Sequence, residues 1–171
     1  MISLLPLSMT TCVCNSNGDP CKLCCDRLCF EEKGKHVKLI PRKAESAIAL
    51  ALDQCIFQDN DLKCDGLFIL SQANRSYVLL VELKGVDIQH AYEQLAYVLN
   101  SRPEYREILD HVRANAAGRL VQKSFIVSSG VLGAKEKQKL ENTWNIRPVL
   151  IAGQKPADKA PDLRDQMYLG S

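Results

Sequence analysis

Two apolar runs lie near the middle of the chain, at residues 64–70 and 77–85, and a short polar spacer separates them at residues 71–76. Both runs carry aromatic and β-branched residues, which predicts two antiparallel strands joined by a turn. Because both faces of each run are mostly apolar, we expect these strands to be central in a sheet and to be covered on both sides.

The register of this expected hairpin decides which of its charged side chains meet. With the turn centred between Ala73 and Asn74, paired positions sum to 147, and Asp65 then faces Glu82. Lys84 lies two residues after Glu82 and therefore shares its face of the strand. Buried charges are costly unless they are paired or bound to a metal. Two carboxylates and a lysine in an apolar hairpin therefore indicate a functional site.

The flanking segments predict further helices and strands in a regular order. Asp87 and the pattern Ser101-x-x-Glu104 are expected to cap two of the helices. The order helix, three strands, helix, strand, helix, strand predicts an α/β fold with a mixed central sheet flanked by helices. Helices are expected over 42–54, 87–100, 101–116 and 134–143, and further strands over 55–57, 120–128 and 147–152.

Composition places the chain among single globular domains. It has 171 residues, of which 46% are apolar and 25% are charged. The net charge of +2 is too small to indicate a polyanionic partner by itself. No apolar run approaches the ~18 residues of a membrane span, and the short apolar start lacks the basic residues of a signal peptide. We therefore expect a cytoplasmic protein with no membrane partner.

Six of the eight cysteines fall between residues 10 and 30, in the spacing C-x-C-x6-C-x-x-C-C-x3-C. Cysteines one or two residues apart on turns rich in Asn, Gly and Pro suit a tetrahedral structural Zn²⁺ site. The alternatives are an iron–sulfur cluster, disulfides in an exported protein, or thiols that bind no metal. The preferred zinc ligands are Cys12, Cys14, Cys21 and Cys24. Cys25 and Cys29 could substitute for one of them or complete a second site.

We accordingly expect three segments: a cysteine-rich, zinc-binding module at 1–30, a main domain at 31–153 and a loose tail at 154–171. The main domain begins with a basic stretch that could follow a phosphate backbone without reading base sequence. An ordinary solvated linker is the alternative interpretation. The candidate nucleic-acid contacts are Lys33, Lys35, Lys38, Arg42 and Lys43.

Asp65, a hairpin and then Glu82-Leu83-Lys84 resemble the core motif of the PD-(D/E)XK nuclease superfamily. Cys64 stands where the motif's name carries a proline, but that position varies widely in the superfamily. Glu45 and Gln94, on the helices expected before and after the hairpin, match positions where members carry a glutamate and a glutamine. The resemblance covers roughly residues 41–152. It implies a restriction-endonuclease-like core, α-β-β-β-α-β with extra helices.

The resemblance also implies an activity, a Mg²⁺-dependent hydrolysis of DNA phosphodiester bonds. Mg²⁺ or Mn²⁺ would be held by Asp65 and Glu82 with help from Glu45, while Lys84 would assist the attacking water and Gln94 would position the phosphate or Lys84. The alternative is a non-catalytic adaptor, in which a nuclease-like fold binds nucleic acid or protein. A homodimer, or a protein partner that supplies targeting, is a further expectation for so small a domain.

Overall fold

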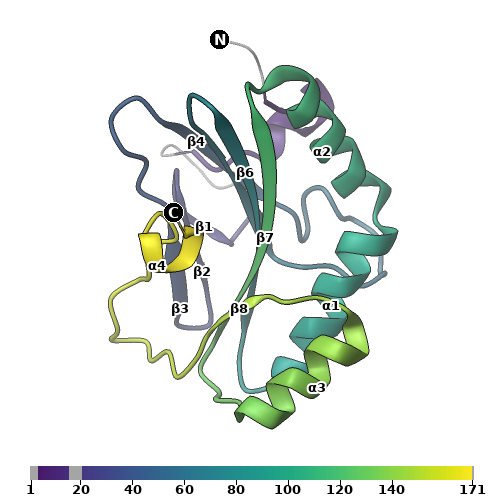
Figure 1. Ribbon diagram of the computed structural model, residues 1–171, viewed down its shortest axis with the longest axis vertical. Coiled ribbons are helices and arrows are strands. Elements are labelled where there is room, and N and C mark those ends of the chain that lie inside the picture. The colour runs from purple at the N-terminus through teal and green to yellow at the C-terminus, as the bar shows by residue number, and fades with distance from the viewer. Residues whose placement is uncertain (1–3, 16–20, 171) are drawn as a thin grey trace.

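The computed structural model describes residues 4–15 and 21–170. Its centre is a five-stranded sheet in the order β4-β5-β6-β7-β8, and a second sheet of three short strands has the order β1-β2-β3 (Figure 1). This confirms a mixed α/β architecture. The strands of the large sheet are β4 (Ser46–Ala51), β5 (Gly66–Ser71), β6 (Arg75–Lys84), β7 (Arg119–Ser128) and β8 (Val149–Ile151).

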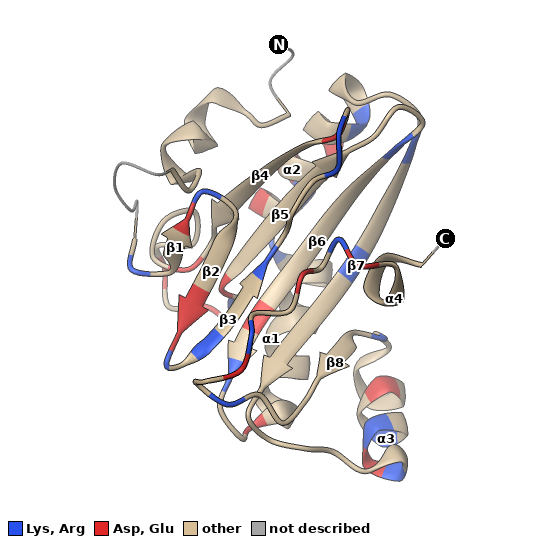
Figure 2. Cartoon of the chain, turned by 90° about the vertical axis from the view of Figure 1, so that its left-hand side faces the viewer, with Lys and Arg blue, Asp and Glu red and all other residues tan. Residues whose placement is uncertain are grey.

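The small sheet and the three long helices lie on opposite faces of the large sheet, and the short C-terminal helix lies on the side of the small sheet (Figures 1 and 2). The strands of the small sheet are β1 (Cys24–Asp26), β2 (Cys29–Glu32) and β3 (Lys35–Lys38). The helices are η1 (Leu7–Cys12), α1 (Ile88–Ser101), α2 (Pro103–Asn115), α3 (Ala134–Trp144) and α4 (Gln166–Leu169). None of the helices in the described ranges is long and apolar enough to cross a membrane.

The β5–β6 hairpin has the predicted register. Leu67 pairs with Leu80 and Ile69 with Val78, so paired positions sum to 147. Every residue of β5 is buried except the last, as expected for a strand covered on both faces. Alternation sends one set of side chains toward the helices and the other toward the small sheet. Each set belongs to its own apolar core.

In the parallel half of the sheet, β7 runs parallel to β6 after the crossover through α1 and α2, and β8 runs parallel to β7 after the crossover through α3. Asp87 caps α1 as predicted, since its side chain accepts a hydrogen bond from the N–H of His90. The capping box predicted at Ser101 is wrong. Ser101 instead ends α1, and α2 begins at Pro103, whose missing N–H suits the first helical turn.

The helix predicted over 42–54 is wrong, because this segment forms the edge strand β4. Its apolar residues fit either period, a common ambiguity of short runs. Pairing with β5 decides the outcome: Ala49 faces one core and Leu50 the other. The strand predicted over 55–57 is also wrong, since this segment is a turn with one isolated bridge between Asp53 and Phe57.

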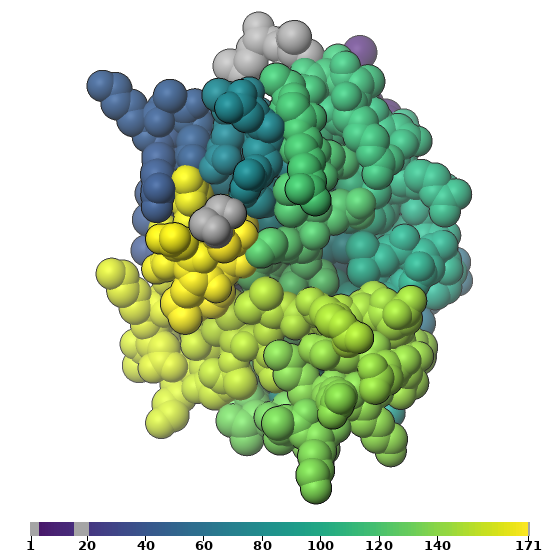
Figure 3. All heavy atoms as spheres, in the orientation of Figure 1, coloured from purple at the N-terminus to yellow at the C-terminus, as the bar shows by residue number. Residues whose placement is uncertain are grey.

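Neither end of the described chain forms a separate module. Met9 and Cys12 lie in the helix-side core, and Phe30 lies in the core under the small sheet. The tail, predicted to be loose, crosses the face of the large sheet opposite α1 (Figure 2) and packs against earlier segments (Figure 3). Leu163 is fully buried, and its N–H donates to the Lys38 carbonyl.

Candidate active site

The carboxylates that the sequence predicts to meet do lie together at one end of the β5–β6 hairpin. The N–H of Asp65 donates to Oε2 of Glu82 at 3.1 Å, and the N–H of Leu83 donates to Oδ2 of Asp65 at 2.6 Å. Only 7% of Asp65 and 2% of Glu82 are exposed. Each carboxyl group is thus held by the backbone of the other's segment, well inside the protein.

Lys84 and Gln94 complete this cluster from β6 and α1. The ammonium group of Lys84 donates to Oε1 of Gln94 at 2.7 Å and lies 3.6 Å from Oε1 of Glu82. The amide nitrogen of Gln94 donates in turn to the Lys63 carbonyl at 2.8 Å. Gln94 therefore fixes Lys84 on one side and the loop that leads to Asp65 on the other.

The loop before Asp65 is held from a second direction by Arg102, which is 4% exposed. Its guanidinium group binds both carboxylate oxygens of Asp59, at 2.6 and 2.8 Å, and lies 4.4 Å from the ring centre of Phe57. It also donates to the carbonyls of Leu62 and Asp61. Because these groups fix residues 57–62, the position of Asp65 does not depend on its own contacts alone.

Burial is the main influence on the protonation of the carboxyl pair. It raises the pKa of Asp65 to about 7, and the charge of Glu32 adds to this rise. Burial, followed by the charge of Asp65, raises the pKa of Glu82 well above its usual range, although Lys84 opposes the change. The hydrogen bonds from backbone N–H groups favour the ionised forms but are outweighed. Near neutral pH the pair therefore retains a proton.

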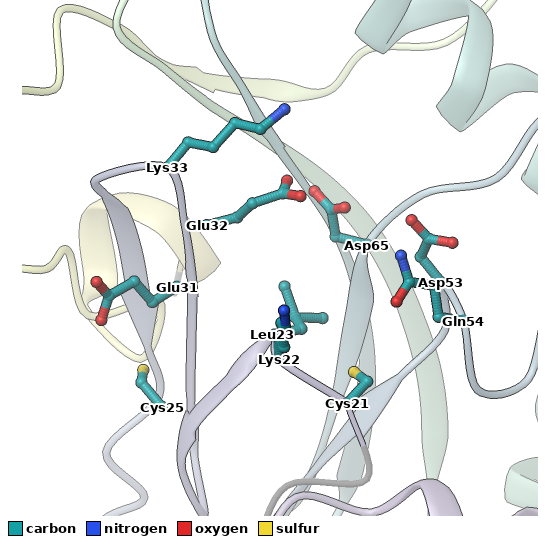
Figure 4. Close-up of a pocket in the computed structure, with 10 residues that line it drawn as sticks. All are labelled: Cys21, Lys22, Leu23, Cys25, Glu31, Glu32, Lys33, Asp53, Gln54 and Asp65. Carbon is teal, nitrogen blue, oxygen red and sulfur yellow. The ribbon is translucent and has the colours of Figure 1, made fainter.

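A cleft of about 420 Å³ opens beside Asp65, which is the one predicted catalytic residue that lines it (Figure 4). One wall is formed by residues 21–23, 25 and 31–33 and the other by Asp53 and Gln54. Glu32 points toward Asp65 in this view, whereas Glu31 points away. The sequence analysis missed Glu32 and Asp53. No local pattern marks either residue, because the docking of the small sheet brings Glu32 to Asp65, and the pairing of β4 with β5 brings Asp53, whose N–H donates to the Asp65 carbonyl.

Glu45 lies elsewhere, and its assignment to the site is wrong. Because Ser46 pairs with Ser71, Glu45 lies at the opposite end of the hairpin from Asp65. The separation is about seven residues, or roughly 20 Å at ~3.3 Å per residue. Its carboxylate binds the guanidinium group of Arg164 at 2.6 and 2.7 Å and accepts from the side chain of Gln72. Glu45 therefore anchors the C-terminal segment.

We expect Arg164→Ala to lower the free energy of unfolding by about 2 kcal/mol at pH 7, the range of charge-assisted hydrogen bonds. Hydrogen bonding from Arg164 lowers the pKa of Glu45 from 4.5 to about 2. The contribution is therefore present above about pH 4.5 and is lost as the pH falls toward 2. Urea denaturation at pH 7 and pH 2.5 measures both effects. Arg147, whose side chain is 67% exposed and binds Glu141, provides a control, since Arg147→Ala should change little. Equal losses in the two variants would contradict the anchoring role.

The cysteines form disulfides, so the predicted zinc module is wrong. Three bonds join Cys12 to Cys55, Cys14 to Cys24, and Cys25 to Cys29. Cys55 lies outside the 10–30 cluster, which is why spacing alone did not indicate it. Five of the six proposed zinc ligands are consumed in this way, and Cys21 lies outside these bonds. Disulfides persist in oxidising compartments, which argues against the expected cytoplasmic location.

The predicted Mg²⁺ or Mn²⁺ centre is also wrong. Within residues 4–15 and 21–170, no group of three or more His, Cys, Asp or Glu side chains is arranged to hold a metal ion. Glu45 is remote from Asp65 and Glu82, and these two accept backbone hydrogen bonds and retain a proton near neutral pH. The residues present therefore do not fit a resident metal, and no catalytic step is derived through one.

The predicted nucleic-acid contacts are distributed over the small sheet and the loop that follows it. Lys33 lies in the β2–β3 turn and lines the cleft. Lys35 is only 8% exposed and offers little charge to a ligand. Lys38 ends β3, and Arg42 and Lys43 follow in the loop before β4. Contact with nucleic acid stays a prediction for this group.

Comparison with known proteins adds no assignment: no family model matches the chain, and no curated protein or solved structure is significantly similar to it. The site therefore has to be interpreted from its own geometry. That geometry is a buried carboxyl pair that shares a proton, a lysine held by a glutamine, and a cleft that reaches one of the carboxyl groups.

Proposed function

We propose that this protein is a nuclease that hydrolyses phosphodiester bonds in DNA, with Asp65, Glu82 and Lys84 as catalytic residues and Gln94 as the residue that positions Lys84. The observation that carries the proposal is the carboxyl pair across the β5–β6 hairpin, with Lys84 on the same face. Such a set combines proton transfer with stabilisation of negative charge, the two requirements of phosphodiester hydrolysis.

The order of the strands supports a restriction-endonuclease-like core. Three antiparallel strands, β4 to β6, are followed by crossover helices and the parallel strand β7. This agrees with the β-β-β-α-β part of the pattern that the motif implies. The helix expected before the first strand is the departure, since residues 42–54 form β4 and a turn instead. The disulfide-bonded small sheet is an addition to the pattern.

Each catalytic residue has a role that follows from its protonation state. Ionised Asp65, at the cleft, would take the proton of the attacking water. Protonated Glu82, which lies behind Asp65 and does not itself line the cleft, would donate its proton to the leaving oxygen when the substrate enters as far as the carboxyl pair. The Lys84 ammonium group, held by Gln94, would stabilise the charge that develops on the phosphate oxygens. General acid and base catalysis contribute about 10²- to 10⁴-fold each to such reactions.

We expect the cleavage rate to depend on pH in a bell-shaped manner. The rate should rise as Asp65 loses its proton, at an apparent pKa of about 7, and fall at higher pH as Glu82 loses its own. Purified, oxidised protein is incubated with plasmid and with linear, single-stranded and branched DNA between pH 5 and 10. Parallel reactions with EDTA and with MgCl2 measure any dependence on added ions directly. Absence of cleavage under all these conditions would refute the proposal.

A non-catalytic binding protein is the second candidate, and the charge of the cleft favours it. Four carboxylates line the cleft, from Glu31, Glu32, Asp53 and Asp65, against the amines of Lys22 and Lys33. An acidic cleft of this kind suits a basic segment of a partner protein. Tight binding of such a partner without any cleavage of DNA would favour this candidate over the nuclease.

The disulfides support an oxidising site of action for the proposed nuclease. Small disulfide-rich proteins are typical of secreted and periplasmic environments. The three bonds all lie in or beside the walls of the cleft. The redox conditions of the compartment therefore determine whether the disulfides beside the candidate site are formed.

A further inference from the structure

Both walls of the cleft are bonded to a single tripeptide, Cys12-Val13-Cys14. The disulfide from Cys12 reaches Cys55, in the turn that follows β4 and carries Asp53. The disulfide from Cys14 reaches Cys24, which lies between the opposite wall's lining residues Leu23 and Cys25. We call this tripeptide with its two disulfides the cysteine staple. It is the covalent connection between the two sides of the cleft that contains Asp65.

The staple is itself seated on the large sheet. The N–H of Cys14 donates to the Ala49 carbonyl at 2.8 Å, and Val13 bridges to Leu50 of β4. Cys12 is 5% exposed and Cys14 is 1% exposed, so both lie within the packed interior. Because the tripeptide is fixed to the sheet, its two disulfides fix the position of both walls relative to the sheet.

The turn at 52–57 is held at its two ends, where the N–H groups of Leu52 and Asp53 donate to the Asp65 carbonyl and Phe57 is fully buried, but the middle of each wall has few contacts besides the staple. β1 has three residues, and beside it the Leu23 carbonyl accepts one backbone hydrogen bond, from Glu31 at 2.9 Å. In the opposite wall, the N–H groups of Cys55 and Phe57 both donate to the Leu52 carbonyl. Short segments with so few backbone bonds open locally at low cost.

The rest of the small sheet is held by packing instead. Phe30 is fully buried, its ring lies 4.5 Å from that of Phe68, and it fills the space above Gly66, where a Cβ atom would lie 2.6 Å from the ring. Val37 is also fully buried. Loss of the staple should therefore release β1 and residues 54–56 in the middle of the turn, while β2, β3 and the large sheet keep their structure.

We propose that the cysteine staple is a redox switch, which holds the two walls in the working shape of the cleft only when both of its disulfides are formed. Each disulfide is broken by two electrons and two protons from a dithiol, such as dithiothreitol, which becomes a cyclic disulfide while the protein gains two thiols. The inference rests on the proposed function, because it makes hydrolysis by the Asp65 site conditional on oxidation. The protein would be inactive where thiols stay reduced and active after export.

Hydrogen exchange of the full chain, followed by mass spectrometry, tests the structural part of the switch without any substrate. In Cys12→Ser/Cys55→Ser, exchange at residues 54–56 should rise at least about tenfold, and in Cys14→Ser/Cys24→Ser the same should occur at 21–25. The Cys25→Ser/Cys29→Ser variant is the matched control. Its lost bond closes a turn within one hairpin, so exchange at 54–56 should be unchanged. Dithiothreitol should reproduce both staple effects in the wild-type protein.

DNA cleavage by the same variants tests the functional part, and both staple variants should lose about tenfold or more in rate. Unchanged hydrogen exchange in the two walls, or raised exchange throughout β5 and β6, would contradict the proposal that the staple holds these two walls alone. Full cleavage by both staple variants would overturn the switch but leave the proposed nuclease intact. No cleavage by the oxidised wild-type protein would refute the nuclease itself and the switch with it.

Discussion

Replacing Glu82 by Gln is expected to lower the rate of DNA cleavage by at least ~10²-fold, the size of effect produced by losing a general acid. The amide has nearly the same shape but cannot deliver a proton to the leaving oxygen. Lys84→Ala should have a similar effect, since it removes the positive charge beside the pair. Gln94→Ala should cost less, because Lys84 would keep its charge and lose only one hydrogen bond.

Single-turnover cleavage at neutral pH measures these losses, and melting temperatures confirm that each variant is folded. Glu107→Gln and Lys159→Ala are suitable controls, since both side chains are exposed and lie outside the site. Their rates should match that of the wild-type protein. Cleavage by Glu82→Gln at the wild-type rate would remove the carboxyl pair from the mechanism, and with it the basis of the proposed function.

Asp65→Asn is expected to stabilise the protein above pH 7, by up to about 4 kcal/mol. Burial raises the pKa of Asp65 from 3.8 to about 7. Between these two pH values the folded state keeps a proton that the unfolded state releases. The free energy of unfolding of the wild-type protein therefore falls as the pH rises through this window. The full cost is about 1.4 kcal/mol for each of the roughly three pH units, and the neutral amide avoids it.

Urea denaturation at pH 4 and pH 8 distinguishes this effect from a general change in packing. At pH 4 both Asp65 and its amide replacement are uncharged in the folded state, so the two proteins should be about equally stable. At pH 8 the variant should be clearly more stable. Asp110→Asn, at an exposed pair on α2, should change stability by less than about 0.5 kcal/mol. A variant less stable than wild type at pH 8 would show that partners stabilise the Asp65 carboxylate more than burial destabilises it.

The buried ionisable groups of this site lower the stability of the folded protein. The carboxyl pair would be easier to fold as neutral amides, yet only ionisable groups can transfer protons. Arg102 and the cysteine staple hold the loops around the carboxyl pair in place, which offsets part of this loss of stability. Strained or repulsive arrangements of this kind are typical of functional sites.

The sequence by itself determined the β5–β6 hairpin, its register and the meeting of Asp65 with Glu82. The reason is local: the two apolar strands are adjacent in the chain, the turn between them is short, and a slip by one residue would turn every apolar side chain to the wrong face. The crossover helices and β7 were predictable for a similar reason. Their apolar periodicity is long enough to distinguish a helix from a strand.

Tertiary contacts alone decided the remaining features. The segment at 46–51 suits a helix or a strand equally, and it is a strand because β5 offers an edge with which to pair. Spacing could not choose between zinc and disulfides, since the partner of Cys12 is 43 residues away. Glu45 was misplaced and Glu32 overlooked for the same physical reason. The contacts of both residues lie with segments that are remote in the chain, and only the packing of the two sheets and the C-terminal segment brings them together.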